Sequence, residues 1–289
     1  MLATLNEVLE IARKNGNAVG SFNTPNLSSI WAVIDAAEKL NQPVVIMHAQ
    51  CHDQFVPIDV VGPAMIALAK KAKVPVCVHL DHGESVEYSN HAVDLGFTSV
   101  MYDGSADPFE KNVADTYAAV RYAHAKGVSV EAELGVPGKR EMGAGHENEV
   151  YHNANAEEIY TDPDQAAIFV EKTHVDALAV SFGTAHGLYL KKPQLDMSVL
   201  DNIGKRTDVP LVMHGGSGIS KEDFETSIRK GIRKVNYYTY MAKAGGEAVV
   251  DLVKKANGNI VYYHDVSYQA KVAMEQNVSD AIRMFALMK

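Results

Sequence analysis

The sequence predicts an α/β protein built as a single (β/α)8 barrel, the TIM barrel, over residues 1–289. Apolar runs rich in β-branched residues alternate with amphipathic segments along the whole chain. Each run is nearly continuous in hydrophobic residues, as expected for parallel strands that are covered on both faces. A chain of 289 residues suits either two ordinary domains or one such barrel.

Eight runs are predicted as strands: Ala18–Ser21, Val44–His48, Val76–Leu80, Ser99–Tyr102, Ser129–Glu133, Ala177–Ser181, Leu211–Met213 and Lys234–Tyr237. Helices are predicted between them at Leu27–Leu40, Val60–Ala72, Val86–Leu95, Pro108–Ala125 and Asp164–Thr173. Prolines near helix starts and glycines after helix ends support these bounds: Pro108, Pro163, Gly96 and Gly127. An extra N-terminal helix, Leu5–Lys14, is expected to cover the barrel floor.

The competing arrangement is a doubly wound open sheet, whose ligands bind at one switch point in the strand order. The candidate site residues described below follow strands spread along the whole chain, which favours the closed barrel. The longest irregular segment, Gly135 to Thr161, follows the fifth strand. We expect it to be a mobile active-site loop, with a plain surface insertion as the alternative.

Composition limits the protein's partners and location. The formal net charge of −9 argues against general binding of nucleic acid, which requires a basic surface. No apolar run approaches the ~20 residues that span a bilayer, and the N-terminus does not resemble a signal peptide. Cys77 lies in an apolar run, so a disulfide with Cys51, the other cysteine, is not expected. We expect a soluble cytoplasmic protein that contacts neither membrane nor nucleic acid.

Three histidines stand where predicted strands run out into polar, Gly-rich sequence. His82 lies in VPVCVHLDHG, His186 in ALAVSFGTAHG and His214 in PLVMHGGSG. Barrel enzymes build their sites at this end of the strands. Three imidazoles are also the ligand count of a catalytic zinc site with one open position. The alternative is that they are three unrelated loop histidines.

Several carboxylates accompany these histidines. Asp81 precedes His82 and can act as a general acid or base, or orient a ligand. Glu131 and Glu133 are two apart on one strand, so both are predicted to face the barrel interior. For Glu131 we favour a structural pairing with a lysine or arginine. Asp103 ends the fourth strand and could reach a metal, or serve in the turn that follows.

Two turns at the end of the chain are candidates for phosphate binding. In HGGSG, we expect Gly215, Gly216 and Ser217 to leave backbone amides open to an anion, with a helix following from about Ser220. The turn NYYTYM after the last strand offers further amides and the Thr239 hydroxyl. Barrels often bind phosphate with the loops after their last two strands. A glycine pair after a strand is otherwise an ordinary turn.

Taken together, these motifs resemble those of the class II, zinc-dependent fructose-bisphosphate aldolases, including the branch that contains tagatose-bisphosphate aldolases. The resemblance runs from VGSFNTPN to the last helix. It is most specific in VPVCVHLDHG, SVMYDGSADPFEKN, VEAELGVPGKRE, SFGTAHG and HGGSG. Several such motifs in the same order are far more specific than any one of them.

The resemblance implies roles for individual residues. Zinc ligands are implied at His82, His186 and His214, and an alternative metal position at Asp103 and Glu133. Asp81 matches the proton donor, and Glu141 matches the base of the mobile loop. Positions that bind substrate and the phosphate of dihydroxyacetone phosphate are matched by Asn23, Gly187, Gly215, Gly216, Ser217, Asn236, Tyr238 and Thr239. Arg283 is a looser match to a distal phosphate ligand from a neighbouring subunit.

The implied activity is reversible cleavage of a ketose 1,6-bisphosphate, fructose 1,6-bisphosphate first, to dihydroxyacetone phosphate and glyceraldehyde 3-phosphate. Tagatose 1,6-bisphosphate or another ketose phosphate is the alternative substrate. One Zn²⁺ per subunit is the implied cofactor, with a monovalent cation as a second candidate, and a homodimer or homotetramer working in glycolysis is the implied assembly. Departures surround the aldehyde half of the site, at Lys139, Tyr237, Tyr238 and Tyr240.

Two other functions fit parts of the pattern. A barrel metallohydrolase would use zinc-bound hydroxide, although no lysine ends a strand where such sites carry one. A non-catalytic sugar-phosphate binder would not need Asp81 and Glu141, which are both present.

Overall fold

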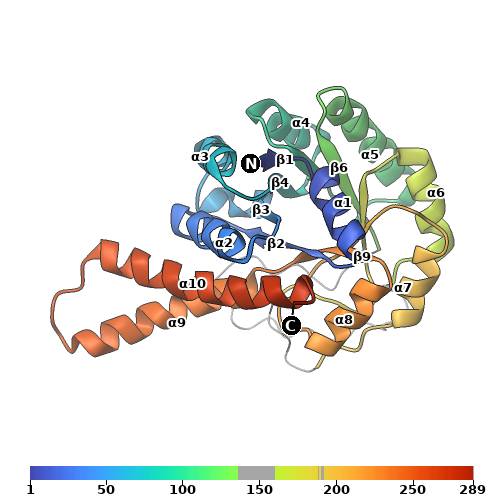
Figure 1. Ribbon diagram of the computed structural model, residues 1–289. Helices are drawn as coiled ribbons and strands as arrows, with labels where there is room; N and C mark the ends of the chain where they lie inside the picture. The colour runs from blue at the N-terminus through green and yellow to red at the C-terminus, as the bar shows by residue number, and fades with distance from the viewer. Residues whose placement is uncertain (136–159, 188, 190–191, 289) are drawn as a thin grey trace.

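The structure is a computed structural model that describes residues 1–135, 160–187, 189 and 192–288. Eight parallel strands close into a barrel in the order β4-β3-β2-β9-β8-β7-β6-β5, with β5 pairing back onto β4. This confirms the predicted TIM barrel (Figure 1). The barrel strands are β2 (Val19–Asn23), β3 (Val44–Ala49), β4 (Val76–Gly83), β5 (Ser99–Tyr102), β6 (Ser129–Leu134), β7 (Ala177–Val180), β8 (Leu211–Met213) and β9 (Ile232–Asn236). A two-residue strand, β1 (Leu2–Ala3), pairs with the start of β4.

Helices cover the outside of the barrel. They are α2 (Leu27–Leu40), α3 (Ile58–Lys71), α4 (Val86–Leu95), α5 (Phe109–His124), α6 (Pro163–Thr173), α7 (Met197–Gly204), α8 (Lys221–Arg229), α9 (Thr239–Ala256) and α10 (Tyr263–Phe285), with a 3-10 turn η1 (Gln50–Gln54) after β3. Local sequence sets their ends. Ser85 caps α4 through its hydroxyl and Gly96 ends that helix in the left-handed conformation, while Pro163 opens α6 behind the Asp162 cap.

The interior of the barrel changes character from floor to mouth. Helix α1 (Leu5–Asn15) places Leu5, Val8 and Leu9 in one apolar cluster with inward side chains such as Val19 and Cys77. This confirms that the extra N-terminal helix covers the floor. Toward the mouth the inward side chains become polar, so the site described below rests on an apolar base.

The predicted elements agree with the observed ones to within a few residues. The main difference is at β4, which was expected to end at Leu80 and continues to Gly83, so that Asp81 and His82 belong to the strand. Cys51 and Cys77 form no disulfide, as predicted. The predicted mobile loop lies outside the described residues except for its ends, Gly135, Tyr160 and Thr161.

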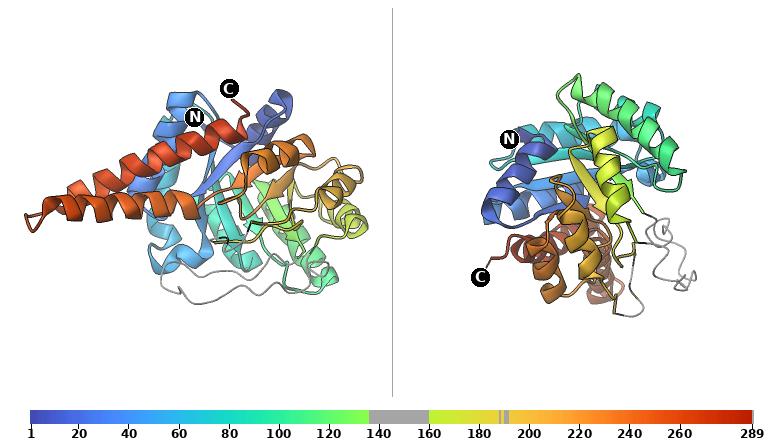
Figure 2. Two further views of the ribbon diagram at one scale, coloured as in Figure 1. Left: turned by 90° about the horizontal axis from the view of Figure 1, so that it is seen from below. Right: turned by 90° about the vertical axis from the view of Figure 1, so that its right-hand side faces the viewer.

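Helices α9 and α10 form an antiparallel arm that projects beyond the barrel (Figure 1), and the left view of Figure 2 shows the same projection. The base of the arm packs on α2, and the last turn of α10 is joined to the start of β2 by a hydrogen bond from the Ala18 N–H to the Phe285 carbonyl (3.0 Å). Within the described ranges, no helix has the length and apolar character needed to cross a lipid bilayer.

Candidate active site

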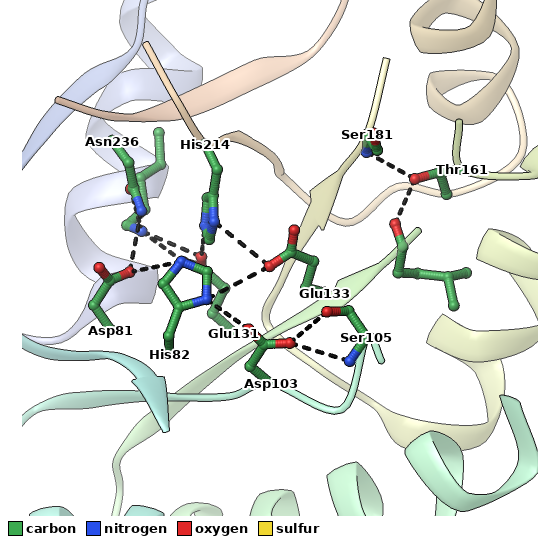
Figure 3. Close-up of polar contacts among 12 residues, drawn as sticks. Asp81, His82, Asp103, Ser105, Glu131, Glu133, Thr161, Ser181, His214 and Asn236 are labelled. Atoms are coloured by element: carbon green, nitrogen blue, oxygen red, sulfur yellow. Dashed lines mark hydrogen bonds and ion pairs between the residues drawn. The ribbon is translucent and has the colours of Figure 1, made fainter. Parts of the chain in front are cut away.

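Polar side chains from six strands or strand ends meet at the C-terminal mouth of the barrel (Figure 3). They are buried although most are ionisable: Asn23, Asp81, Asp103, Glu131, Glu133, His214 and Asn236. The segment that follows β7 adds His186. Buried ionisable groups are costly unless they are paired or bind a metal, so this gathering indicates a functional site.

The backbone of β4 turns His82 toward this mouth. Simple alternation would aim Asp81 inward and His82 outward. His82 instead has a left-handed φ of 47°, and the pairing of β4 with β5 shifts register between Leu80 and Gly83. A non-glycine residue in this conformation is uncommon and is found at functional sites. Both neighbours can therefore face the site.

The three predicted imidazoles come together. The ring centres of His82 and His214 are 4.8 Å apart, those of His82 and His186 5.2 Å, and those of His186 and His214 5.6 Å. One nitrogen from each ring can be chosen so that all three lie within 4.8 Å of one another. A second group of three, His82 with Asp103 and Glu133, meets the same criterion.

Carboxylates fix the orientation of His82. Its Nδ1 lies 2.6 Å from Asp103 Oδ2 and 3.7 Å from Glu133 Oε2. Asp103 is itself held by the Ser105 hydroxyl, which donates to Oδ1 at 2.6 Å. Burial alone would lower the pKa of His82, but the carboxylates of Asp81 and Asp103 outweigh it and raise this pKa to about 9. With Nδ1 facing Asp103, Nε2 is the nitrogen left for a metal.

His214 provides the test of whether the site fits a metal. Its Nε2 lies 3.0 Å from Glu131 Oε1, and because a carboxylate only accepts, Nε2 carries the proton. Its buried Nδ1 has no hydrogen-bond partner among the described residues and lies 3.6 Å from Glu133 Oε2. An imidazole held by a carboxylate on one side, with its other nitrogen turned to a cluster of donors, is the arrangement of a zinc ligand. The residues present therefore fit the metal.

Asp81 is held as a charged carboxylate. Asn23 Nδ2 donates to Oδ2 at 2.8 Å and Asn236 Nδ2 donates to Oδ1 at 3.1 Å. Burial would raise the pKa of Asp81, but its electrostatic interactions with His82, His214 and Lys234, together with the hydrogen bond from Asn23, outweigh this and hold the pKa far below its usual range. Its Oδ1 lies 3.9 Å from His82 Nε2, the atom that faces the metal position.

The expected phosphate turn is present, with one correction. Gly215 has a left-handed φ of 65°, and a Cβ there would lie 2.2 Å from the Ala185 carbonyl oxygen, so only glycine fits. The Gly216 N–H is not open to an anion as predicted, because it donates to the Asn236 carbonyl at 2.9 Å. That bond ties the loop after β8 to the end of β9. The helix expected from about Ser220 is confirmed as α8, with Ser220 as its cap.

The turn after β9 ends in the N-terminus of α9. Tyr238 occupies the N-cap position of α9, and its side chain makes no capping hydrogen bond. The Tyr238 side chain therefore neither accepts from the first backbone amides of the helix, which begins at Thr239, nor offsets the positive end of the helix dipole. Tyr237 points the other way, since its ring packs on Phe22 and Phe285 in the core. Tyr240 lies over the phosphate turn, where its backbone N–H donates to the Ser217 hydroxyl at 3.4 Å.

The remaining predicted residues differ in where they lie relative to the mouth of the barrel. Gly187 follows His186 directly and has a left-handed φ of 96°. Arg283 is on the last turns of α10 and pairs with Asp280 at 3.4 Å. That end of α10 lies by the start of β2, at the opposite end of the strands from the mouth, so Arg283 does not reach the site of its own barrel. Glu141 and Lys139 lie outside the described residues.

Sequence reasoning missed two buried groups at the site. His52, on η1, packs its ring against Tyr238 at 5.1 Å between centres, and its Nδ1 has no hydrogen-bond partner among the described residues. Burial lowers the pKa of His52 to about 4, so its ring is neutral at pH 7. Lys234 is fully buried on β9 and pairs with Glu131 at 2.9 Å. A lysine inside a predicted buried strand was the available signal for the second.

Comparison with known proteins agrees with this geometry. The family model described as "Fructose-bisphosphate aldolase class-II" matches residues 3–288. The chain belongs to the class II fructose-bisphosphate aldolase family. It is therefore an aldolase of the lyase class, and the cluster of His82, His186 and His214 could hold the metal that this family implies.

Individual relatives cover nearly the whole chain. A fructose-bisphosphate aldolase of Staphylococcus aureus is 38% identical over 291 residues, covering 98% of this chain and 97% of that protein. The crystal structure of the YdjI aldolase from Escherichia coli K12 superposes with a TM-score of 0.84 at 36% identity, covering 99% of this chain and 97% of that one. A fructose-bisphosphate aldolase structure from Campylobacter jejuni gives a TM-score of 0.81 at 23% identity, covering 99% and 96%, and supports the fold.

Proposed function

We propose that this member of the family is a zinc-dependent aldolase that reversibly cleaves fructose 1,6-bisphosphate to dihydroxyacetone phosphate and glyceraldehyde 3-phosphate. One catalytic domain, residues 1–289, carries the reaction. The observation that supports it most is the cluster of three imidazoles beside a charged carboxylate that two amides hold in place. The Staphylococcus aureus relative, named a fructose-bisphosphate aldolase, supports the choice of sugar.

His82, His186 and His214 would hold the zinc. When bound, zinc supplies Lewis-acid polarisation of the ketone carbonyl and stabilises the negative charge that develops on carbon 3 as the bond breaks. The Asp103 and Glu131 carboxylates orient two of these imidazoles through their second nitrogens. Asp103 and Glu133 form the alternative metal position.

Asp81 is the proposed base for cleavage. Breaking the bond between carbons 3 and 4 requires loss of the proton on the carbon-4 hydroxyl, and Asp81 accepts it and returns it in condensation. Asn23 and Asn236 keep both carboxylate oxygens fixed while this occurs. Glu141 is proposed to exchange the proton at carbon 3.

Phosphate binding is assigned to the two turns. We assign the phosphate to Gly187, Gly215, Ser217 and Thr239. Thr239 begins α9, and the Ser217 hydroxyl accepts a hydrogen bond from the next N–H of that helix; backbone amides and the helix dipole at such an N-terminus favour an anion. Gly216 serves this turn through its bond to Asn236 and its lack of a side chain. Tyr238, next to His52, borders the aldehyde half of the substrate.

The decisive experiment is a coupled assay for dihydroxyacetone phosphate over a substrate panel. The panel contains fructose and tagatose 1,6-bisphosphates and several ketose 1-phosphates, each with zinc, with chelator, and with monovalent salts varied. We expect fructose 1,6-bisphosphate to give the highest kcat/KM, and chelator to abolish it. Activity that resists chelator, or that borohydride traps as a Schiff base, would overturn the zinc mechanism. Equal rates on the two bisphosphates would remove the sugar assignment.

We also propose that the protein self-associates through the arm. The two helices of the arm and the segment between them expose large apolar side chains: Val250, Val253, Ile260, Tyr262, Tyr263 and Tyr268. Such a concentration on a projecting element favours a protein partner, and a second copy offers the same surface in return. Sedimentation should show a dimer or tetramer, and Tyr263→Glu with Tyr268→Glu should shift it toward monomer. A parent chain that sediments as a monomer at micromolar concentration would exclude this.

A further inference from the structure

We propose that Lys234 is a positioning residue that sets both the orientation of the Asn236 amide toward Asp81 and the tautomer of His214. The inference rests on the proposed function, because it concerns the proposed base and a proposed zinc ligand. Lys234 is fully buried on β9 beneath the site. Its ammonium lies 2.9 Å from Glu131 Oε2, 3.2 Å from Glu131 Oε1 and 2.7 Å from Asn236 Oδ1.

The first effect concerns the amide of Asn236. Lysine has only donors, so the Asn236 atom that faces it at 2.7 Å must be the oxygen. This turns Nδ2 to the other side, where it donates to Asp81 Oδ1 at 3.1 Å. Without Lys234 the amide could rotate by half a turn, and its oxygen would then face the Asp81 carboxylate. Lys234 therefore decides whether Asn236 stabilises or repels the charge on Asp81.

The second effect concerns His214. Lys234 contacts both oxygens of Glu131, and Glu131 Oε1 faces His214 Nε2 at 3.0 Å. The carboxylate therefore has one fixed rotamer, in which it accepts the Nε2 proton and leaves Nδ1 for the metal. The other neighbour of Glu131 is His79, whose Nε2 lies 3.7 Å from Oε2 and whose Nδ1 is 2.8 Å from the Ser99 hydroxyl. Lys234 is thus the cation that holds this carboxylate under the histidine.

The competing view is that Lys234 only neutralises Glu131 and keeps the barrel folded. Removing Lys234 alone would leave a buried carboxylate without its cation and could prevent folding. The test variant is therefore Lys234→Met with Glu131→Gln, which removes both charges at similar volume. A second variant, Asn236→Ala, keeps the Lys234–Glu131 pair and removes only the amide.

Three quantities are measured on the full-length protein: the melting temperature, the zinc dissociation constant against a competing dye, and kcat and KM separately. For Lys234→Met with Glu131→Gln we expect the zinc dissociation constant to rise about 10- to 100-fold, as for loss of an outer-shell partner. We expect kcat in zinc-saturated protein to fall about 10- to 100-fold, as for a lost hydrogen bond to a charged group, with little change in KM. Asn236→Ala should lower kcat and leave the zinc dissociation constant at the parental value.

A folded double variant with parental zinc affinity and kcat would overturn the proposal, whatever its melting temperature. If the zinc dissociation constant changes and kcat does not, the effect assigned to the Asn236 amide is wrong. If kcat changes and the zinc dissociation constant does not, the effect assigned to His214 is wrong. If the double variant does not fold, Asn236→Ala decides the first effect, and an unchanged kcat there overturns it. If the parent protein releases dihydroxyacetone phosphate from none of the sugars in the panel, the proposed function is refuted instead. The zinc dissociation constant of the double variant then still tests the effect on His214, because that measurement does not depend on turnover.

Discussion

Replacing Asp81 by asparagine tests the proposed base with almost no change in shape. The parent carboxylate accepts one hydrogen bond from Asn23 and one from Asn236, while an amide at position 81 has only one oxygen. One of the two contacts then becomes donor against donor. Asn236 cannot turn to relieve it, because its oxygen accepts from Lys234, so the conflict falls on Asn23. The expected loss of unfolding free energy is about 1–3 kcal/mol.

The catalytic effect of Asp81→Asn should be much larger than this. Loss of a positioned general base costs about 10²- to 10⁴-fold in rate, or about 2.7–5.4 kcal/mol of transition-state stabilisation. Zinc content should stay at the parental level, because the three imidazoles are untouched. The assay combines kcat on fructose 1,6-bisphosphate with metal analysis of the same sample. Asp53→Asn is the control, since Asp53 lies within η1, is hydrogen-bonded to His48 and Tyr88, and takes no part in the proposed proton transfer. A metal-loaded Asp81→Asn protein with less than about tenfold loss of kcat would refute the role.

Three further predictions concern other parts of the site. Gly216→Ala should lower the unfolding free energy by about 1–3 kcal/mol and weaken phosphate binding. The reason is that a Cβ at this position would lie 2.7 Å from Val235 Cγ1 and 2.8 Å from the Asn236 carbonyl oxygen. An unchanged melting temperature would contradict this prediction. Zinc binding at pH 7 should release a proton, because the metal-free pKa of His82 is raised to about 9 and only the neutral ring can bind. Apparent zinc affinity should therefore rise with pH up to about 9, and titration calorimetry in buffers of different ionisation enthalpy should detect the proton; identical heats would count against it. His52→Ala should raise KM for the aldehyde in condensation while KM for dihydroxyacetone phosphate stays constant, since His52 lies against Tyr238; equal changes in both would show a general loss of structure.

Local patterns in the sequence were enough to predict the barrel, because strand and helix periodicity are properties of neighbouring residues. The helix bounds at Leu27–Leu40 and Val86–Leu95 agree with the observed ones residue for residue. The three imidazoles were also predictable, since every parallel strand of a barrel ends at the same rim. The conformation of His82 was not, because alternation along β4 would have turned it outward and only its left-handed backbone brings it in.

For contacts between distant strands, the sequence could predict the type of partner that a residue needs but could not predict which residue supplies it. A buried glutamate requires a cation, which is why a lysine or arginine was expected for Glu131. Its partner, Lys234, is 103 residues away, and no local pattern couples the two. The same holds for Asn236, whose bond to Asp81 joins strands 155 residues apart in sequence. The Gly216 amide was misjudged for this reason as well, since its acceptor lies at the end of another strand.

The charges at the mouth explain why a metal and a base belong together there. Four carboxylates of the described residues, Asp81, Asp103, Glu131 and Glu133, are buried around one lysine and one imidazole whose pKa favours the protonated form. Without a metal, the formal charge of these six groups is therefore minus two. A divalent ion bound in place of the His82 proton would leave a formal charge of minus one on this cluster, and Asp81 is the carboxylate to which we assign the substrate proton. In the proposed cleavage, the proton that Asp81 accepts removes this last charge, so the electrostatics of the buried cluster favour the proton transfer that the reaction needs.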